Sequence, residues 1–434
     1  MEYINSGLIL EVSARGSVLK MSLFERESFA QTVRHYNNVD VDFKQIQHLS
    51  EDIINSLNRS FAKEDINVSE NIRKTGQLLW DYIIAKPVKE KLKYSPSQDL
   101  ILSLEEELSG IPWEMLYDGA DFLALKFNIG RLLKSQGNAP TPRYRSLSPR
   151  LKMLILADPG GDLKSSYQEG LYIRNRFEKK QKRITIDFKS TQIEKIYVKK
   201  NLRDYDIVHF AGHCEYNQVE PLKTGWILSD GKFSIEDIQA LAQSPHFPSL
   251  VFSNSCHSAV LGAATQMACS QRENYNLAQA FLFAGVRHYI GSIRKIEDNA
   301  SLAFASEFYD NLVQGRSIGE CMRLGRLKLQ QEYGPKDSFW TSYLLYGDPS
   351  FSFFSQYLDS SVGSKKDLLI PNRKFYLVYT TLILALLLSL AFRHLPTLNP
   401  QAYSLYYSSK SMLSRGENKQ AIASLEKVIT KDPL

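Results

Sequence analysis

Apolar and polar residues alternate along residues 8–24, and the alternation breaks at Ala14-Arg15-Gly16-Ser17. A two-residue period interrupted by a glycine-containing turn predicts a β-hairpin. Apolar residues then recur at helical spacing over 43–61 and 68–84, which predicts two helices. A short apolar run over 99–104 predicts a further strand. This part of the chain is therefore expected to be a mixed α/β region.

From residue 151 to about 355, strand-like and helix-like patterns alternate. The predicted strands are 152–157, 184–188, 206–211, 250–253, 288–292 and 342–345, and the predicted helices are 166–179, 192–202, 235–241, 277–284, 298–312 and 317–331. Such alternation predicts an α/β fold with a mainly parallel sheet and helices on both faces. A basic, proline-rich connector over 137–150 marks the boundary between regions 1–150 and 151–355.

The C-terminal part contains an uncharged apolar segment, 375–392, preceded by a basic linker, 356–374. Its length is enough for a slightly short transmembrane helix, although a buried core helix would also be apolar on every face. Basic residues are more numerous before this segment than after it. The positive-inside rule therefore predicts a single-pass membrane protein with its 151–355 region in the cytoplasm.

Composition adds few constraints. With 43% hydrophobic and 23% charged residues, the chain is ordinary globular protein, and a net charge of +6 is too weak to indicate a nucleic-acid partner. The four cysteines are irregularly spaced, so a reducing compartment is expected rather than a disulfide framework. The segment 160–165 lacks the glycine–lysine spacing of a phosphate-binding loop, and no cofactor is expected.

Two apolar runs end abruptly in small and polar residues, as buried parallel strands do where they deliver side chains to a crevice. The run 207–211 leads to Gly212 and His213, and the run 250–253 leads to Cys256. A cysteine nucleophile needs a base to take the thiol proton and backbone N–H groups to stabilise the oxyanion. The two strand ends therefore predict a Cys–His nucleophilic site.

Other roles for these residues are open. His209 lies inside its apolar run, so we interpret it as a buried, hydrogen-bonded core histidine rather than the base. A zinc site could draw on His209, His213, Cys214, Cys256 and His257. Their spacings are not those of structural zinc sites and no carboxylate accompanies them, so no metal is expected.

Four ordered segments resemble the CHAT domain, a caspase-like family named for its association with tetratricopeptide repeats. They are 111–114, 206–213, 250–256 and 340–349, and the resemblance covers residues from about 70 to 352. It implies a caspase–separase-type fold in which a degenerate half precedes the active half, and it implies endopeptidase activity. By the family's motifs, His213 is the catalytic histidine and Cys256 the catalytic cysteine. The implied oxyanion donors are the N–H groups of Cys256 and Cys214, the latter standing where related enzymes often carry glycine.

Residues 254–258 are also similar to the metacaspase pattern, in which an aspartate two positions before the cysteine binds a basic P1 side chain. Here that position is Asn254. An uncharged amide cannot form a charge-assisted pair, so a neutral or polar P1 is expected. Arg294 stands where many relatives carry tryptophan. It could line a pocket for an acidic side chain, or it could be an exposed structural arginine.

Residues 400–434 resemble a single tetratricopeptide repeat, forming a helical hairpin. One repeat cannot bury its own face, so either the array is truncated or the hairpin docks on a regulatory protein partner. These observations together predict a membrane-anchored caspase-like cysteine endopeptidase that cleaves protein or peptide substrates through a thioester. The alternative is a catalytically silent CHAT scaffold that acts through protein–protein interactions.

Overall fold

The structure is a computed structural model, and it describes residues 7–26, 34–61, 68–134, 144–147, 149–242, 246–256, 258–259, 276–334, 338–354 and 400–431. The chain divides into two compact units, Met1–Gln356 and Tyr357–Leu434.

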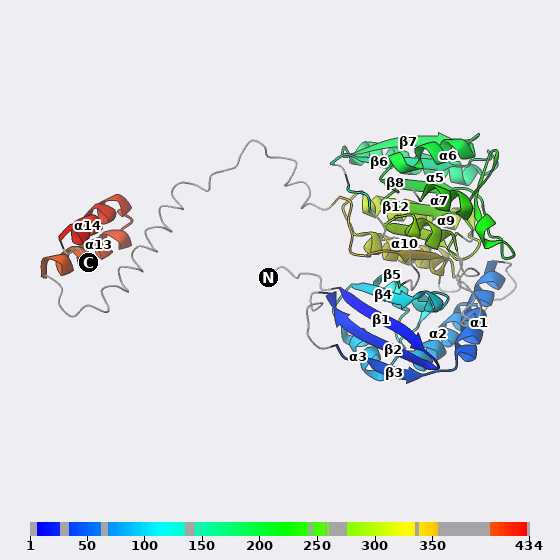
Figure 1. The fold of residues 1–434 in the computed structure, drawn as a ribbon, viewed down its shortest axis with the longest axis horizontal. Helices are drawn as coiled ribbons and strands as arrows, with labels where there is room; N and C mark the ends of the chain where they lie inside the picture. The colour runs from blue at the N-terminus through cyan, green and yellow to red at the C-terminus, as the bar shows by residue number, and fades with distance from the viewer. Residues whose placement is uncertain are drawn as a thin grey trace. The chain divides into compact units, whose positions relative to one another are not determined.

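Within the described residues of the first unit, eleven strands form one sheet in the order β3-β2-β1-β4-β5-β14-β13-β12-β8-β6-β7 (Figure 1). The strands are β1 (Leu8–Arg15), β2 (Val18–Glu25), β3 (Asn37–Asp40), β4 (Asp99–Glu105), β5 (Asn128–Lys134), β6 (Leu151–Ala157), β7 (Ile184–Ser190), β8 (Ile207–Ala211), β12 (Leu250–Asn254), β13 (His288–Ser292) and β14 (Tyr343–Tyr346). Most neighbours are parallel, and the antiparallel pairs are β1–β2, β2–β3 and β13–β14. The predicted mixed α/β fold with a mostly parallel sheet is therefore confirmed.

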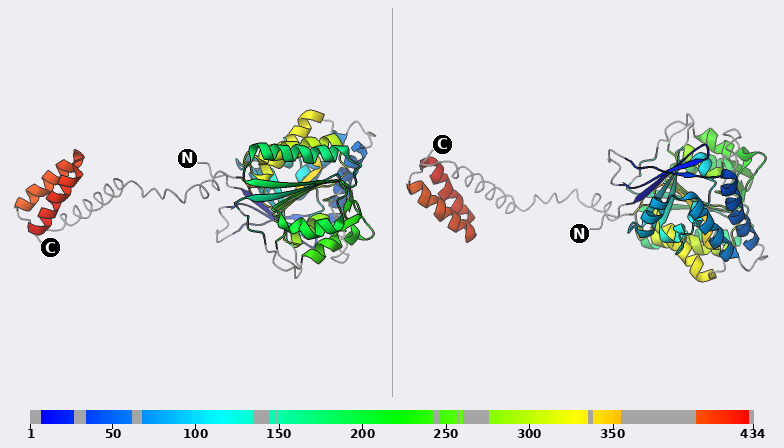
Figure 2. Two further views of the ribbon diagram at one scale, coloured as in Figure 1. Left: turned by 90° about the horizontal axis from the view of Figure 1, so that it is seen from above. Right: turned by 90° about the horizontal axis from the view of Figure 1, so that it is seen from below.

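The helices of this unit that the sequence pattern predicts begin and end close to the expected residues. They are α1 (Phe43–Phe61), α2 (Val68–Ile83), α5 (Lys164–Lys180), α6 (Lys195–Asn201), α7 (Ile235–Leu241), α8 (Leu277–Phe283), α9 (Asp298–Leu312) and α10 (Ile318–Tyr333). Two further helices, α3 (Lys86–Tyr94) and α4 (Leu123–Lys126), and the strands β3 and β5 were not anticipated. Helices lie on both faces of the sheet (Figure 2).

The predicted hairpin at 8–24 is present as β1 and β2, with Arg15 paired to Val18 across the turn. Gly16 lies in the turn at a φ of 58°. That left-handed conformation has no steric penalty for glycine, which explains why the alternation breaks there.

The central strands β8, β12 and β13 are buried along their whole length. This is the burial expected of parallel strands with helices on both faces, and it explains their nearly continuous apolar sequences. On one side of the sheet α9 packs against both α5 and α10, and elsewhere α7 packs against α8.

The sheet is continuous across the connector at 137–150. Strand β14, from the end of the unit, lies between β13 and β5 and pairs Tyr346 with Arg131. Both predicted regions, 1–150 and 151–355, thus contribute strands to one sheet.

A separate three-stranded sheet lies beside the main one. It contains β9 (Cys214–Glu215), β10 (Gly225–Leu228) and β11 (Gly231–Ser234), in the order β11-β10-β9. The hairpin of β10 and β11 turns at Ser229 and Asp230, and Gly231 begins β11 opposite Leu228. Because β9 begins directly after His213, this small sheet anchors one flank of the predicted site.

The second unit contains an antiparallel helical hairpin, α13 (Pro400–Ser414) and α14 (Asn418–Lys431). Gly416 lies between the helices at a φ of 75°, and Ala421 is fully buried. The hairpin is as expected, whereas its identity as a tetratricopeptide repeat stays a prediction. The segment 375–392 lies outside the described residues. Among the residues that are described, no helix combines the length and the hydropathy needed to cross a bilayer.

Candidate active site

The predicted catalytic residues leave the ends of two adjacent parallel strands. Strand β8 pairs with β12 in a register that sets Ala211 beside Asn254. His213 and Cys256 each follow two residues later. Adjacent strands lie ~4.8 Å apart, so the two residues leave the sheet at the same level and from neighbouring positions.

The two side chains also lie on the same face of the sheet. In β8, the ring of His209 contacts Tyr309 of α9, whereas Phe210 stacks on Trp226 on the opposite face. By strand alternation, His213 follows His209 onto the α5–α9 side. Asn254 also points to that side, where its Nδ2 donates to Glu169 of α5, so alternation directs Cys256, two residues later, to the same face.

Cys256 is only partly exposed. Burial raises the pKa of its thiol above the ordinary value, while the backbone N–H of Ile296 and the charge of Lys295 act in the opposite direction. The resting residue is therefore a thiol at neutral pH. A neighbouring base is needed to generate the thiolate.

His213 is half exposed, and its Nε2–H donates to Oδ2 of Asp162 over 3.1 Å. Asp162 belongs to the loop between β6 and α5. The sequence of residues 158–162 predicts a turn after a strand, and that of 160–165 invites a phosphate-loop interpretation, but neither pattern connects Asp162 with His213. The signal was its place at the C-terminal end of β6, the strand next to β8.

By the same alternation, Cys214 is directed to the other face, and its thiol interacts with both Cys256 and Ser255. Burial raises the pKa of the Cys214 thiol to about 12. A thiol so rarely ionised is a poor nucleophile, which leaves Cys256 as the reactive candidate of the two.

The backbone of Cys214 is nevertheless well placed. Ile227 donates its N–H to the carbonyl of His213 over 2.9 Å, and Cys214 is the next pair along, opposite Trp226. In an antiparallel ladder, hydrogen-bonded and non-hydrogen-bonded pairs alternate. The N–H of Cys214 therefore points away from β10 and donates no hydrogen bond to that strand.

The turn after Cys256 is held by serines. Ser258 Oγ donates to the carbonyl of Ser253 over 2.9 Å and accepts the N–H of Ser292 of β13, also over 2.9 Å. The N–H of Ala259 donates to the carbonyl of Ser292 over 2.7 Å. These bonds tie Ser258 and Ala259 back to β12 and across to its neighbour β13.

Asn254 lies beneath the site in a buried network. Its Nδ2 donates to Oε1 of Glu169 over 2.7 Å, and its Oδ1 accepts from the hydroxyl of Tyr343 over 2.6 Å. Glu169, on α5, is 2% exposed and also accepts from His209 Nε2 over 2.7 Å and from Ser301 Oγ over 3.2 Å. One carboxylate thus binds both strands that carry the catalytic candidates. A single glutamate on a helix has no sequence signature, so Glu169 was missed.

His209 is fully buried, with Nδ1 bonded to the hydroxyl of Tyr309 over 3.1 Å. It is the core histidine expected from its position inside the strand. It is committed to Glu169 on its other nitrogen. In the part of the chain that the structure describes, no three His, Cys, Asp or Glu side chains cluster in a way that could hold a metal ion.

Arg294 is 1% exposed, so the interpretation as an exposed arginine is wrong. Its Nε donates to Ser342 Oγ over 3.0 Å, its Nη1 donates to the carbonyl of Leu57 over 2.6 Å, and its guanidinium lies over the ring of Phe339. These bonds join α1 to the 151–355 region. Its predicted contact with substrate stays a prediction.

Trp113 and Glu114 of the first motif are also buried. Trp113 donates from Nε1 to the carbonyl of Leu108 over 2.9 Å. Glu114 forms a bidentate ion pair with Arg131. They support the fold where β5 meets β14.

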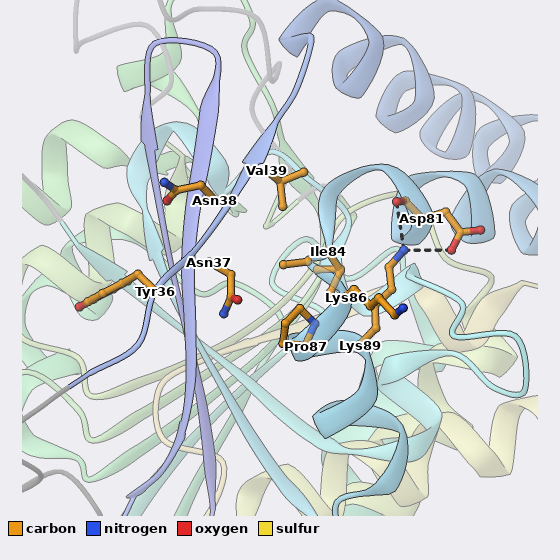
Figure 3. A pocket seen from close by; sticks show the side chains of 10 residues that line it. Tyr36, Asn37, Asn38, Val39, Asp81, Ile84, Lys86, Pro87 and Lys89 are labelled. Carbon is orange, nitrogen blue, oxygen red and sulfur yellow. Dashed lines mark hydrogen bonds and ion pairs between the residues drawn. The ribbon is translucent and has the colours of Figure 1, made fainter.

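An open pocket of about 580 Å³ lies in the N-terminal half, between strand β3 and the junction of α2 with α3. Figure 3 shows Tyr36 and Asn37 on the strand side, and Ile84 and Lys86 on the helix side. None of the predicted catalytic or substrate-binding residues lines it.

Comparison with known proteins identifies the family and the fold. The family model of the CHAT domain matches residues 73–348. The fold is similar to separase in two crystal structures of the Saccharomyces cerevisiae separase–securin complex. In the first, the TM-score is 0.53 at 11% identity, covering 80% of this chain and 30% of that chain, and in the second it is 0.52 at 11% identity, covering 79% and 30%.

The Arg-specific cysteine proteinase gingipain R matches with a TM-score of 0.45 at 14% identity, covering 65% of this chain and 74% of that chain. No curated protein matches the sequence significantly. The chain spans 30% of the length of the separase chain that it matches, so the likeness shows a caspase-like fold and nothing beyond it.

Proposed function

Because the chain belongs to the CHAT-domain family, we propose that it is a cysteine endopeptidase with Cys256 as nucleophile and His213 as base. The observation that supports this proposal is the register of β8 and β12, together with the contacts of His209 and Asn254, from which alternation directs both residues to one face. A thiol and an imidazole at neighbouring strand ends are the components of nucleophilic acyl transfer.

In the proposed reaction, His213 takes the proton from Cys256, and the sulfur attacks the scissile carbonyl carbon. The oxyanion is stabilised by the backbone N–H groups of Cys256 and Cys214. The latter role is supported by the orientation of Cys214 in the β9–β10 ladder. The imidazolium of His213 then protonates the leaving amine, which breaks the C–N bond and leaves a thioester. Water, deprotonated by His213, hydrolyses the thioester and regenerates the thiol.

The experiment is a peptide-library cleavage assay on four proteins: the wild type and the variants C256A, H213A and C214A. We expect no cleavage above background by C256A and H213A, and cleavage within about twofold of the wild type by C214A, because only the backbone of Cys214 takes part. If the library is cleaved equally by the wild type and C256A, the endopeptidase is refuted in favour of the silent scaffold. The same profile reports the P1 preference. We propose a neutral or polar P1, because Asn254 is uncharged and its amide is already bonded to Glu169 and Tyr343, so it offers a basic side chain no carboxylate.

We also propose that 375–392 anchors the protein to a membrane. Its uncharged apolar sequence supports this. Alkaline carbonate extraction of the full chain should leave it in the membrane pellet, while a chain ending at residue 356 should be released. Release of both proteins would refute the anchor.

A further inference from the structure

We propose that Asp162 is a positioning residue for His213, holding the imidazole in one orientation and one tautomer. The inference rests on the proposed function. It starts from one contact, the 3.1 Å bond between His213 Nε2 and Asp162 Oδ2. The surrounding backbone shows why this contact is fixed although both side chains reach solvent.

The loop that carries Asp162 is built around Asp158. The Oδ1 of this buried aspartate accepts the backbone N–H groups of Asp162 and Leu163, each over 2.9 Å. Asp158 itself has a φ of 50°, a left-handed conformation that aspartate tolerates better than most residues. The position of the Asp162 backbone is therefore set from inside the fold.

The same loop is joined to the strand that carries the histidine. The N–H of Asp158 donates to the carbonyl of Ala211, the last residue of β8, over 2.8 Å. Pro159 packs so closely on Gly212 that a Cβ there would lie 2.9 Å from the proline Cδ. Asp162 and His213 therefore belong to two segments that contact each other directly. The contacts fall at Ala211 and Gly212, within two residues of His213.

The bond determines which nitrogen of His213 meets the thiol. A carboxylate accepts hydrogen bonds only, so Nε2 carries the proton and donates it to Asp162. Nδ1 is then the basic nitrogen that takes the proton from Cys256. When it does, the imidazolium is stabilised by the negative charge of Asp162, which favours the thiolate–imidazolium pair over the neutral pair.

Three other charged groups among the described residues near the site interact elsewhere than with His213. Glu215, two residues after His213, pairs with Lys232 of β11 over 2.7 Å. Lys295 and Asp298 act on the thiol of Cys256 from the start of α9. Asp162 is thus the carboxylate bonded to the imidazole, and Glu215 is a matched carboxylate nearby.

The test measures the rate at which iodoacetamide alkylates Cys256, followed by mass spectrometry, in the full chain near neutral pH and at strongly alkaline pH. In the variant D162N we expect the neutral-pH rate to fall about two- to fivefold, because a half-exposed ion pair is lost. At alkaline pH, where the thiol ionises without help from the imidazole, the rate should be unchanged. A merely structural role for Asp162 would change both rates.

Two variants complete the experiment. D162E should recover the wild-type ratio of the two rates, since its carboxylate still reaches the ring, and the control E215Q should equal the wild type. An unchanged ratio in D162N, with the rate still dependent on His213, would overturn the role of Asp162 and leave the proposed peptidase standing. If H213A alkylates Cys256 at the wild-type rate at neutral pH, then the proposed dyad fails, and the inference fails with it.

Discussion

Asn254, two residues before the candidate nucleophile Cys256, donates a 2.7 Å hydrogen bond to the carboxylate of Glu169. The same oxygen of Glu169 binds His209, four residues before the candidate base. The buried carboxylate of Glu169 therefore holds the ends of β8 and β12 in place, while His213 and Cys256, just beyond those ends, remain partly exposed. Precise placement of the reacting groups depends on such support from residues that never touch substrate.

Replacing Glu169 with glutamine should destabilise the fold by about 3 kcal/mol, because an NH2 donor would replace one of the two oxygens that accept from His209, Asn254 and Ser301. Urea unfolding measures the change. The matched control on the same helix is E178Q, whose solvent-exposed pair with Arg174 should contribute little to stability.

Exchanging the carboxylate of Glu169 with the amide of Asn254 gives a sharper test. The double variant E169Q/N254D restores one carboxylate and one amide in contact, so we expect it to recover about half of the stability lost in E169Q. Simple addition of the two single-variant losses would show that Glu169 and Asn254 do not act as a unit.

The two cysteines at the site should differ in reactivity. Burial raises the pKa of Cys214 to about 12, so its thiolate is scarce at neutral pH. Native alkylation followed by peptide mapping should therefore modify Cys256 well before Cys214, and C214A should label at the wild-type rate. Preferential modification of Cys214 would contradict the assignment of the nucleophile.

Acid should destabilise the protein through His288. This histidine of β13 is fully buried against Phe351, and burial lowers its pKa to about 4. Since the unfolded chain binds a proton at about pH 6.5, stability is complete above that pH and falls as the pH drops towards 4. The loss from this group is about 3 kcal/mol.

The variant H288N removes this titration. Its free energy of unfolding should vary less between pH 6.5 and 4 than that of the wild type, by about the same 3 kcal/mol, whatever its absolute stability. Substitution of the exposed His48 serves as control. An identical pH dependence in wild type and H288N would exclude His288 as the cause.

Arg294 should matter for stability rather than for selectivity. Lysine cannot reproduce its separate bonds to Ser342 and Leu57, so R294K should lose about 2–3 kcal/mol in urea unfolding. Its P1 preference in the peptide library should match that of the wild type. A changed preference without loss of stability would instead place Arg294 in the substrate pocket.

The sequence was informative where local pattern decides the structure. The apolar runs before His213 and Cys256 predicted two buried strands, and their abrupt polar ends predicted where the side chains emerge. What it could not supply were relationships between distant segments. Arg294 is buried because it reaches the carbonyl of Leu57, and Asp162 meets His213 because β6 lies beside β8. Neither contact leaves a periodic signal along the chain.

The position of β14 has a consequence for synthesis. Arg131 of β5 pairs with Tyr346, and no earlier strand takes that place in the described sheet. While the ribosome makes the intervening chain, β5 presents an unpaired edge, which is the kind of surface that aggregates or recruits chaperones. The sheet is complete only after β14 has emerged, which is later than the strand that carries Cys256. Strand β12 therefore joins a sheet that is not yet complete.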